Sequence, residues 1–197
     1  MRDYLRYFAK GWHSVIFVSG GVRSGKSKKA EELVQRSEGE RHVYIATSRI
    51  TDGEMRERVN LHQKARRGAK QPWVTVEQVN NFHTLLPKLK KTDVVLVDCA
   101  TNWMANELFI DAQSWEDHQL CQSIVEKMKQ DLLAIKSSVK EVVVVSNELF
   151  EGDVPDEATE VYMRLLGSFH QFLVEESSTA GVMEYGLFKV KKGDVVL

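Results

Sequence analysis

The sequence predicts an α/β fold in which helices cover both faces of a mostly parallel sheet. Three observations support this prediction. An apolar run at 15–18 leads into a glycine-rich loop at 20–27, and a charged, amphipathic segment at 28–36 follows the loop. Short β-rich runs alternate with helical patterns along the rest of the chain, and one of them, at 93–98, ends in an acidic residue. This order of elements is typical of a three-layer domain that binds a nucleotide through a P-loop.

The glycine-rich loop carries the most specific motif. Its residues, Gly20-Gly21-Val22-Arg23-Ser24-Gly25-Lys26-Ser27, fit the pattern G-x-x-x-x-G-K-S between a strand and a helix. Glycines let the backbone wrap so that N–H groups point at phosphate oxygens, Lys26 adds a cation for the terminal phosphates, and the Ser27 hydroxyl can ligate Mg²⁺. The sequence therefore predicts that a nucleoside triphosphate with Mg²⁺ binds at this loop.

Length and composition narrow the class of protein. The 197 residues suit one domain, and their net charge of −1 gives no general attraction to nucleic acid. Apolar runs are far shorter than the ~20 residues of a membrane span, and the first residues do not resemble a signal peptide. Cys99 and Cys121 match no metal or disulfide spacing. We therefore expect a cytoplasmic protein with no nucleic-acid partner and no membrane span.

Before residue 70 the chain is expected to hold one further strand and one polar helix. Residues 1–13 form an N-terminal extension, which is either a short docking helix or a frayed terminus. The run 42–47 predicts a buried strand, and the hydroxyls of Thr47 and Ser48 either approach the nucleotide or cap the next element. The predicted helix at 52–67 has few apolar side chains, so it is either a solvated surface helix or an arm that reaches a ligand.

Two strands, 73–77 and 93–98, are expected next, with a helical segment near 79–90 between them. The second strand is hydrophobic and ends at Asp98, which is the form of a Walker B element. A carboxylate at this position can hold Mg²⁺, directly or through water, opposite Ser27. The alternative is that Asp98 caps the following helix.

The second half of the chain continues the alternation of helices and strands. Helices are expected over 99–112, 114–137 and 157–176, and strands over 141–146 and in two stretches around Gly186. The helix at 114–137 has an apolar stripe that we assign to the core: Leu120, Ile124, Met128, Leu132 and Ile135. Two polar residues, Asn147 and Glu148, follow the strand at 141–146.

In chain order, these motifs resemble the bifunctional adenosylcobinamide kinase/adenosylcobinamide-phosphate guanylyltransferase family of cobalamin biosynthesis. The resemblance covers residues 15–155 well and the remainder poorly. Besides the loop, it is carried by Ala30-Glu31, Tyr44-Ile45-Ala46-Thr47, Asp52-Gly53-Glu54-Met55 with Arg58 and His62, Trp73-x-Thr75-x-Glu77, Val97-Asp98-Cys99-x-Thr101-Asn102-Trp103 with Asn106, Ser146-Asn147-Glu148 and Gly152-x-Val154-Pro155.

The resemblance implies two activities on one RecA-like P-loop fold. ATP or GTP would phosphorylate the hydroxyl of adenosylcobinamide's aminopropanol arm, and GMP from GTP would then pass to that phosphate through a guanylylated histidine. By position, His62 matches the nucleophilic histidine, and Lys26 and Mg²⁺ would neutralise charge on the leaving phosphates. A corrinoid substrate and a homotrimer are also implied. Further nucleotide contacts are implied for Ala46, Thr47, Ser48, Gln63, Lys64, Ala65, Arg66, Glu77 and Asp98.

Several positions depart from the family pattern. The segment from His62 to Trp73 is longer than the family's usual spacing, and Phe150 stands where the family has glycine. Phe150 would impose a different loop if that position needs a positive φ. The arginine-rich segment expected after Pro155 is largely missing, and His170 stands where asparagine is usual. These differences concern the corrinoid surface and the trimer contacts more than the phosphate site.

Two other interpretations remain open at this point. The chain could be a diverged P-loop kinase of the same family that lacks guanylyl transfer. It could also be a nucleotide-binding module whose output is a contact with another protein, because a fold does not determine a function. The histidines other than His62 match no motif and are expected at the surface or in packing.

Overall fold

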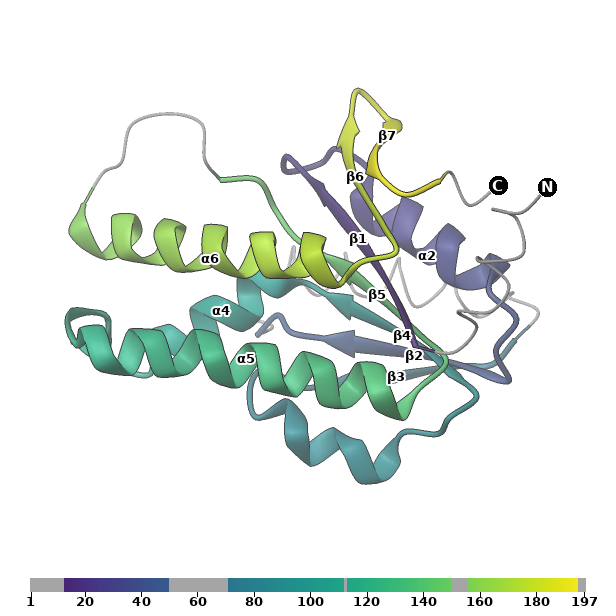
Figure 1. Cartoon of the computed structure of the whole chain (residues 1–197), viewed down its shortest axis with the longest axis horizontal. Coiled ribbons are helices and arrows are strands. Elements are labelled where there is room, and N and C mark those ends of the chain that lie inside the picture. Colours follow the sequence, from purple (N-terminus) through teal and green to yellow (C-terminus); the bar gives the residue numbers. More distant parts are fainter. Residues whose placement is uncertain (1–12, 50–70, 112, 150–155, 195–197) are drawn as a thin grey trace.

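A seven-stranded sheet forms the centre of the computed structural model, which describes residues 13–49, 71–111, 113–149 and 156–194 (Figure 1). Its strands are β1 (Ser14–Gly20), β2 (Arg41–Ala46), β3 (Trp73–Glu77), β4 (Asp93–Asp98), β5 (Glu141–Val145), β6 (Thr179–Glu184) and β7 (Leu187–Lys192). Their order across the sheet is β3-β2-β4-β5-β1-β6-β7. Neighbouring strands are parallel except β6 and β7, which are antiparallel. The predicted mostly parallel sheet is therefore confirmed.

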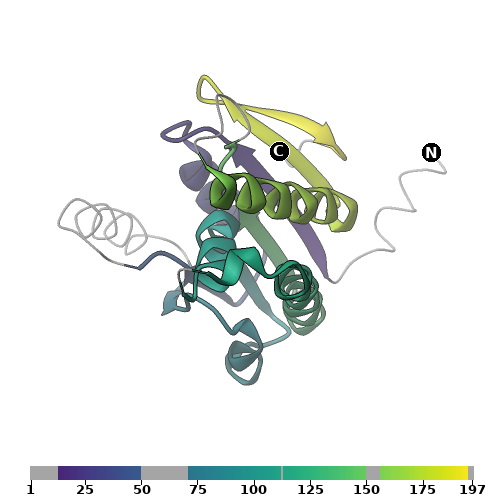
Figure 2. The ribbon, with the colours of Figure 1, turned by 90° about the vertical axis from the view of Figure 1, so that its left-hand side faces the viewer.

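Helices cover both faces of this sheet. In the described part of the chain they are α2 (Lys26–Arg36), α4 (Ala100–Leu108), α5 (His118–Ser138) and α6 (Glu157–Glu176), with 3₁₀ helices η1 (Phe82–Lys88) and η2 (Ser114–Glu116). Helix α2 packs on one face, and α4, α5 and α6 pack on the other (Figures 1 and 2). The arrangement is the predicted three-layer α/β fold.

Successive residues of the inner strands pack on opposite faces of the sheet. In β1, Val15 and Phe17 belong to the core shared with α4, α5 and α6, whereas Ile16 and Val18 belong to the core shared with α2. Strands β4 and β5 show the same alternation. Side chains on a strand alternate between its two faces, and here helices cover both. This is why these strands are continuous apolar runs in the sequence.

The start of α5 differs from the prediction because of a capping residue. The predicted helix at 114–137 begins instead at His118, since the Asp117 carboxylate accepts hydrogen bonds from the backbone N–H groups of Gln119 (2.9 Å) and Leu120 (3.0 Å). The preceding helix, predicted over 99–112, ends at Leu108. The boundary between the two helices was therefore placed wrongly.

Two further expectations are corrected by the structure. The segment near 79–90 forms the 3₁₀ helix η1, which contains Pro87; proline lacks the N–H that a longer α-helix needs. Leu120 was assigned to the core but is 36% exposed. An α-helix has 3.6 residues per turn, so eight residues make slightly more than two turns. Leu120 therefore lies about 80° around the helix from Met128 in the buried stripe.

Some predictions fall outside the residues that the structure describes. These are the N-terminal extension up to residue 12, the polar helix at 52–67 with His62, and the loop that Phe150 was expected to change. Within the described residues, the helices are too short or too polar to cross a bilayer.

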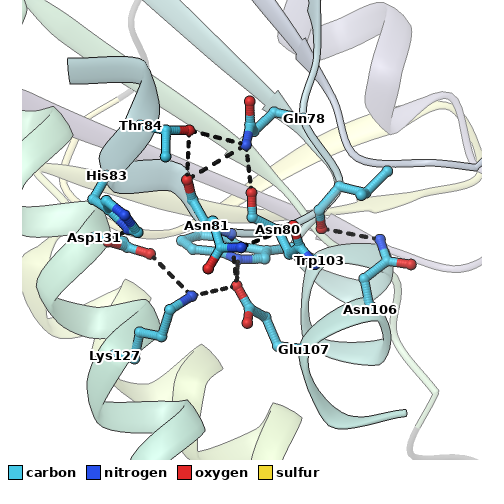
Figure 3. Close-up of polar contacts among 11 residues, drawn as sticks. Gln78, Asn80, Asn81, His83, Thr84, Trp103, Asn106, Glu107, Lys127 and Asp131 are labelled. Carbon is cyan, nitrogen blue, oxygen red and sulfur yellow. Dashed lines mark hydrogen bonds and ion pairs between the residues drawn. The ribbon is translucent and has the colours of Figure 1, made fainter. Parts of the chain in front are cut away.

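A buried polar cluster joins η1 to α4 and α5 next to the sheet (Figure 3). Glu107 of α4 is 5% exposed, and its Oε1 atom accepts hydrogen bonds from the backbone N–H of Asn81 (3.1 Å) and from Trp103 Nε1 (3.3 Å). Lys127 of α5 lies 2.6 Å from Glu107 Oε1 and 3.6 Å from Asp131 Oδ2. Burial raises the pKa of the Asp131 carboxyl, while Lys127 opposes this rise. The Lys127 ammonium thus faces both buried carboxylates, and His83 Nδ1 lies 4.0 Å from Asp131 Oδ1.

This cluster predicts unequal effects for two neighbouring lysines. Lys127→Met should lower the free energy of unfolding by about 2 kcal/mol, because it leaves Glu107 and Asp131 buried without the lysine ammonium. Lys129→Met removes an ion pair with the exposed Glu126 and a contact of the ammonium with the Phe172 ring (5.7 Å), and it should lower the free energy of unfolding by about 1 kcal/mol or less. Urea unfolding of both variants measures the difference. Equal effects would contradict the assigned role of Lys127.

Candidate nucleotide-binding site

The P-loop connects the carboxyl end of β1 to the start of α2. Three of its residues have a positive φ: Gly20 (150°), Arg23 (61°) and Gly25 (93°). Backbone N–H groups that follow one another through such turns form a concave surface that binds anions. The structure therefore shows the backbone path that the motif predicted.

Gly20 must be glycine because of how closely the chain approaches itself. A Cβ atom added there would lie 2.8 Å from the carbonyl oxygen of Met183 in β6 and 2.8 Å from Ser24 Oγ. The positive φ of Gly20 is also unfavourable for other residues. The loop can start its turn at this point only because no side chain separates it from β6.

Lys26 lies inside the loop. It is 8% exposed, and its Nζ donates a hydrogen bond to the Gly21 carbonyl oxygen (2.9 Å). Lys26 also starts α2, which has no acidic residue in its first turn and no side-chain cap among the described residues. The positive end of the helix dipole thus faces the loop together with the ammonium group. Both features attract phosphate.

Asp98 and Ser27 are partly exposed groups on either side of β5, which separates β4 from β1. Asp98 ends β4, and its Oδ2 atom accepts a hydrogen bond from the Tyr44 hydroxyl of β2 (3.0 Å). Tyr44 therefore orients the carboxylate. The sequence alone did not reveal this role, although Tyr44 lies two residues before the end of β2, which pairs with the strand of Asp98.

Helix α4 holds the ends of β2 and β3 in place. Asn106 Nδ2, labelled in Figure 3, donates to the carbonyl oxygens of Thr47 (2.8 Å) and Val79 (3.1 Å). Asn102 Nδ2 donates to Ser48 Oγ (2.7 Å). Two asparagines one helical turn apart thus connect the segments that follow both strands.

Thr47 is more buried than Ser48, the residue that follows it. It is fully buried, and its hydroxyl accepts from the Cys99 backbone N–H (2.6 Å) and donates to the Cys99 carbonyl oxygen (2.9 Å). This hydroxyl therefore ties β2 to the start of α4. Ser48 is partly exposed.

The structure spreads the remaining predicted contacts along one edge of the sheet. Ala46 and Glu77 end β2 and β3, at the side of the sheet far from the P-loop. Neighbouring strands lie about 5 Å apart, so four strand spacings separate Glu77 from β1 by about 19 Å. The stretch from His62 to Arg66 lies outside the described residues.

A second polar network lies at the end of β5. His170 Nε2 of α6 is 2.7 Å from Ser146 Oγ, which is 3.0 Å from Thr101 Oγ1 of α4. Thr101 Oγ1 accepts from the Asn147 backbone N–H (2.8 Å). Burial lowers the pKa of His170 to about 4. The network connects α4 and α6 to β5, the strand beside the P-loop. The sequence did not reveal it, because His170 belongs to no motif.

Comparison with known proteins supports the family resemblance. The family model for cobinamide kinase / cobinamide phosphate guanyltransferase matches residues 16–190. The bifunctional adenosylcobalamin biosynthesis protein CobU of Escherichia coli K12 is 31% identical over 180 residues, which is 88% of this chain and 97% of that protein. The corresponding protein CobP of Pseudomonas aeruginosa PAO1 is 34% identical over 179 residues, 90% of this chain and 96% of its own length.

Solved structures support the fold. An ATPase from the type III secretion system of pathogenic bacteria superposes with a TM-score of 0.57 at 11% identity, over 92% of this chain and 57% of that one. The ATPase EscN of enteropathogenic E. coli gives a TM-score of 0.54 at 11% identity, over 91% of this chain and 48% of that one. The identity is too low to carry a function, but the shared architecture confirms the P-loop NTPase fold.

The lowered pKa of His170 predicts a pH dependence of stability. Between pH 6.5, the usual value, and pH 4 the unfolded chain binds a proton that the folded protein does not. The contribution of neutral His170 to the free energy of unfolding is therefore fully present above pH 6.5. It is lost as the pH falls from 6.5 to 4, by an amount on the order of 3 kcal/mol. His170→Gln should reduce this slope, and above pH 7 the two proteins should show parallel profiles. Denaturant unfolding from pH 4 to 8 measures this, and an unchanged slope in the variant would contradict it.

Proposed function

The chain belongs to the cobinamide kinase / cobinamide phosphate guanyltransferase family, and on that premise we propose that it carries out both reactions on a corrinoid substrate. In the first, a nucleoside triphosphate phosphorylates adenosylcobinamide. In the second, GMP from GTP is transferred to adenosylcobinamide phosphate, giving adenosylcobinamide-GDP. The observation that carries the proposal is the P-loop, whose concave backbone encloses the buried Lys26.

Phosphoryl transfer depends mainly on positioning and on neutralising charge. The N–H groups of the loop and the first turn of α2 bind the phosphate oxygens. Lys26, already inside the loop, lies where charge develops on the phosphates during transfer. Because the loop is held between β1 and α2, its donors keep these positions as the reaction proceeds.

Ser27 and Asp98 would hold Mg²⁺ at this site. Both offer oxygen, the ligand that Mg²⁺ prefers, both are partly exposed, and the Tyr44 hydroxyl already orients Asp98. Two protein oxygens suffice for Mg²⁺ when substrate phosphates and water complete its shell. When bound, Mg²⁺ would neutralise negative charge on the phosphates.

We assign the guanylyl intermediate to His62 on the strength of the family resemblance. A neutral imidazole nitrogen attacks the α-phosphorus of GTP, a P–N bond forms, and the bond to pyrophosphate breaks. The labile P–N bond then passes GMP to the phosphate of the corrinoid. In this proposal Gln63, Lys64, Ala65 and Arg66 contact the nucleotide, as do Ala46, Ser48 and Glu77 at the strand ends. Thr47, which was also expected to do so, is fully buried, and its hydroxyl is engaged by the Cys99 backbone.

Covalent labelling tests the second reaction. Incubation with [α-³²P]GTP and Mg²⁺ should leave label on the protein that is acid-labile and base-stable, as expected of a phosphohistidine bond. His62→Ala should abolish this label. Unlabelled wild-type protein, or label that persists in the variant, would contradict the assignment of His62.

A second pair of variants tests whether one P-loop serves both reactions. Lys26→Met should lower the rates of phosphorylation and of GMP transfer by about 100-fold or more, because both use the phosphate cradle. His62→Ala should abolish GMP transfer and leave phosphorylation of adenosylcobinamide measurable. Assays of each half-reaction with separately supplied substrates measure this, and a Lys26→Met protein with one reaction intact would show that the site is not shared.

A further inference from the structure

Glu148 lies directly beside the P-loop. It follows β5, and its backbone N–H donates to the carbonyl oxygen of Gly20, the first residue of the loop (3.1 Å). The Ser146 N–H donates to the Val18 carbonyl oxygen in the same way (3.0 Å). The pairing of β5 with β1 therefore continues past the end of the strand, and it holds Glu148 at the mouth of the phosphate cradle.

Ser19 fixes the direction of the Glu148 carboxylate. The Ser19 hydroxyl, on a residue that is 5% exposed, donates to Glu148 Oε1 (3.0 Å). Glu148 itself is exposed, and Ser19 is the one side chain among the described residues that bonds its carboxylate. No lysine or arginine of the described chain pairs with it. The carboxylate of this exposed residue is thus held next to the loop through its Oε1 atom.

The other carboxylates at this edge of the sheet are farther away or already paired. Strand spacing places Asp98 about 10 Å and Glu77 about 19 Å from β1. Glu184 ends β6, on the opposite side of β1 from Glu148, but its carboxylate forms an ion pair with Lys189. Among the acidic residues that end the described strands or directly follow them at this edge, Glu148 is therefore the one that lies beside the P-loop without an ion pair.

We propose that Glu148 is the general base of the kinase reaction, a role that rests on the proposed phosphorylation of a corrinoid hydroxyl. Kinases place a carboxylate where it accepts the proton of the attacking hydroxyl. The substrate O–H proton passes to Glu148, the new bond forms between that oxygen and the γ-phosphorus, and the bond from the γ-phosphorus to the β–γ bridging oxygen breaks. The nucleoside diphosphate leaves, and Glu148 returns its proton to solvent.

The two half-reactions of the proposed function make this role testable in one protein. Glu148→Gln keeps an oxygen for the Ser19 hydroxyl but cannot accept a proton. Its kcat for phosphorylation of adenosylcobinamide should fall by about 100- to 10,000-fold. Transfer of GMP from GTP to supplied adenosylcobinamide phosphate needs no hydroxyl deprotonation, so it should stay within about twofold of wild type.

Three comparisons decide between a base and a structural residue. Glu184 ends β6, which pairs with β1 on the side away from β5. The control variant Glu184→Gln should leave the rate of phosphorylation unchanged. Glu148→Asp should recover part of the activity, and the acid limb of the pH profile of kcat should be present in this variant. If both half-reactions fall together in Glu148→Gln, or if phosphorylation is unaffected, Glu148 is not the base. Wild-type protein that phosphorylates no corrinoid would instead overturn the proposed function.

Discussion

The parallel pairing of β5 with β1 is the interaction on which the site depends. The two strands pair from Ser14 with Glu141 to Val18 with Val145, and the ladder continues through the N–H groups of Ser146 and Glu148. This register brings the loop after β1 and the polar residues after β5 to the same edge at the same height. A shift of one residue would turn every side chain of β5 to the other face of the sheet and move Ser146 and Glu148 out of register with the loop after β1.

Helix α4 has a second organising role at that edge. Its polar residues bond to segments that follow three different strands: Thr101 to the segment after β5, and Asn102 and Asn106 to those after β2 and β3. Trp103 of the same helix is fully buried and stacks on Phe82 of η1. One helix therefore couples the hydrophobic core to the backbone that lines the candidate site.

Local sequence patterns predicted most elements of the fold. The apolar strands were recognised because helices bury both of their faces, and the P-loop because its glycines and Lys26 have defined backbone and charge requirements. Boundaries were less accurate where a single contact decided them. The cap by Asp117 moved the start of α5, and Leu120 left the core because a small rotation accumulates over two turns.

Motif and order along the chain were sufficient to indicate the fold class, the phosphate-binding loop and the pairing of Ser27 with Asp98 as candidate Mg²⁺ ligands. Resemblance to a family added His62 and the two reactions. The partners of individual side chains were decided by tertiary structure alone: Tyr44 on Asp98, His170 on Ser146, and Ser19 on Glu148. Each of these pairs joins elements that are distant in the chain, and the strand order that makes them neighbours depends on how the whole sheet assembles. No local pattern in the sequence carries that information.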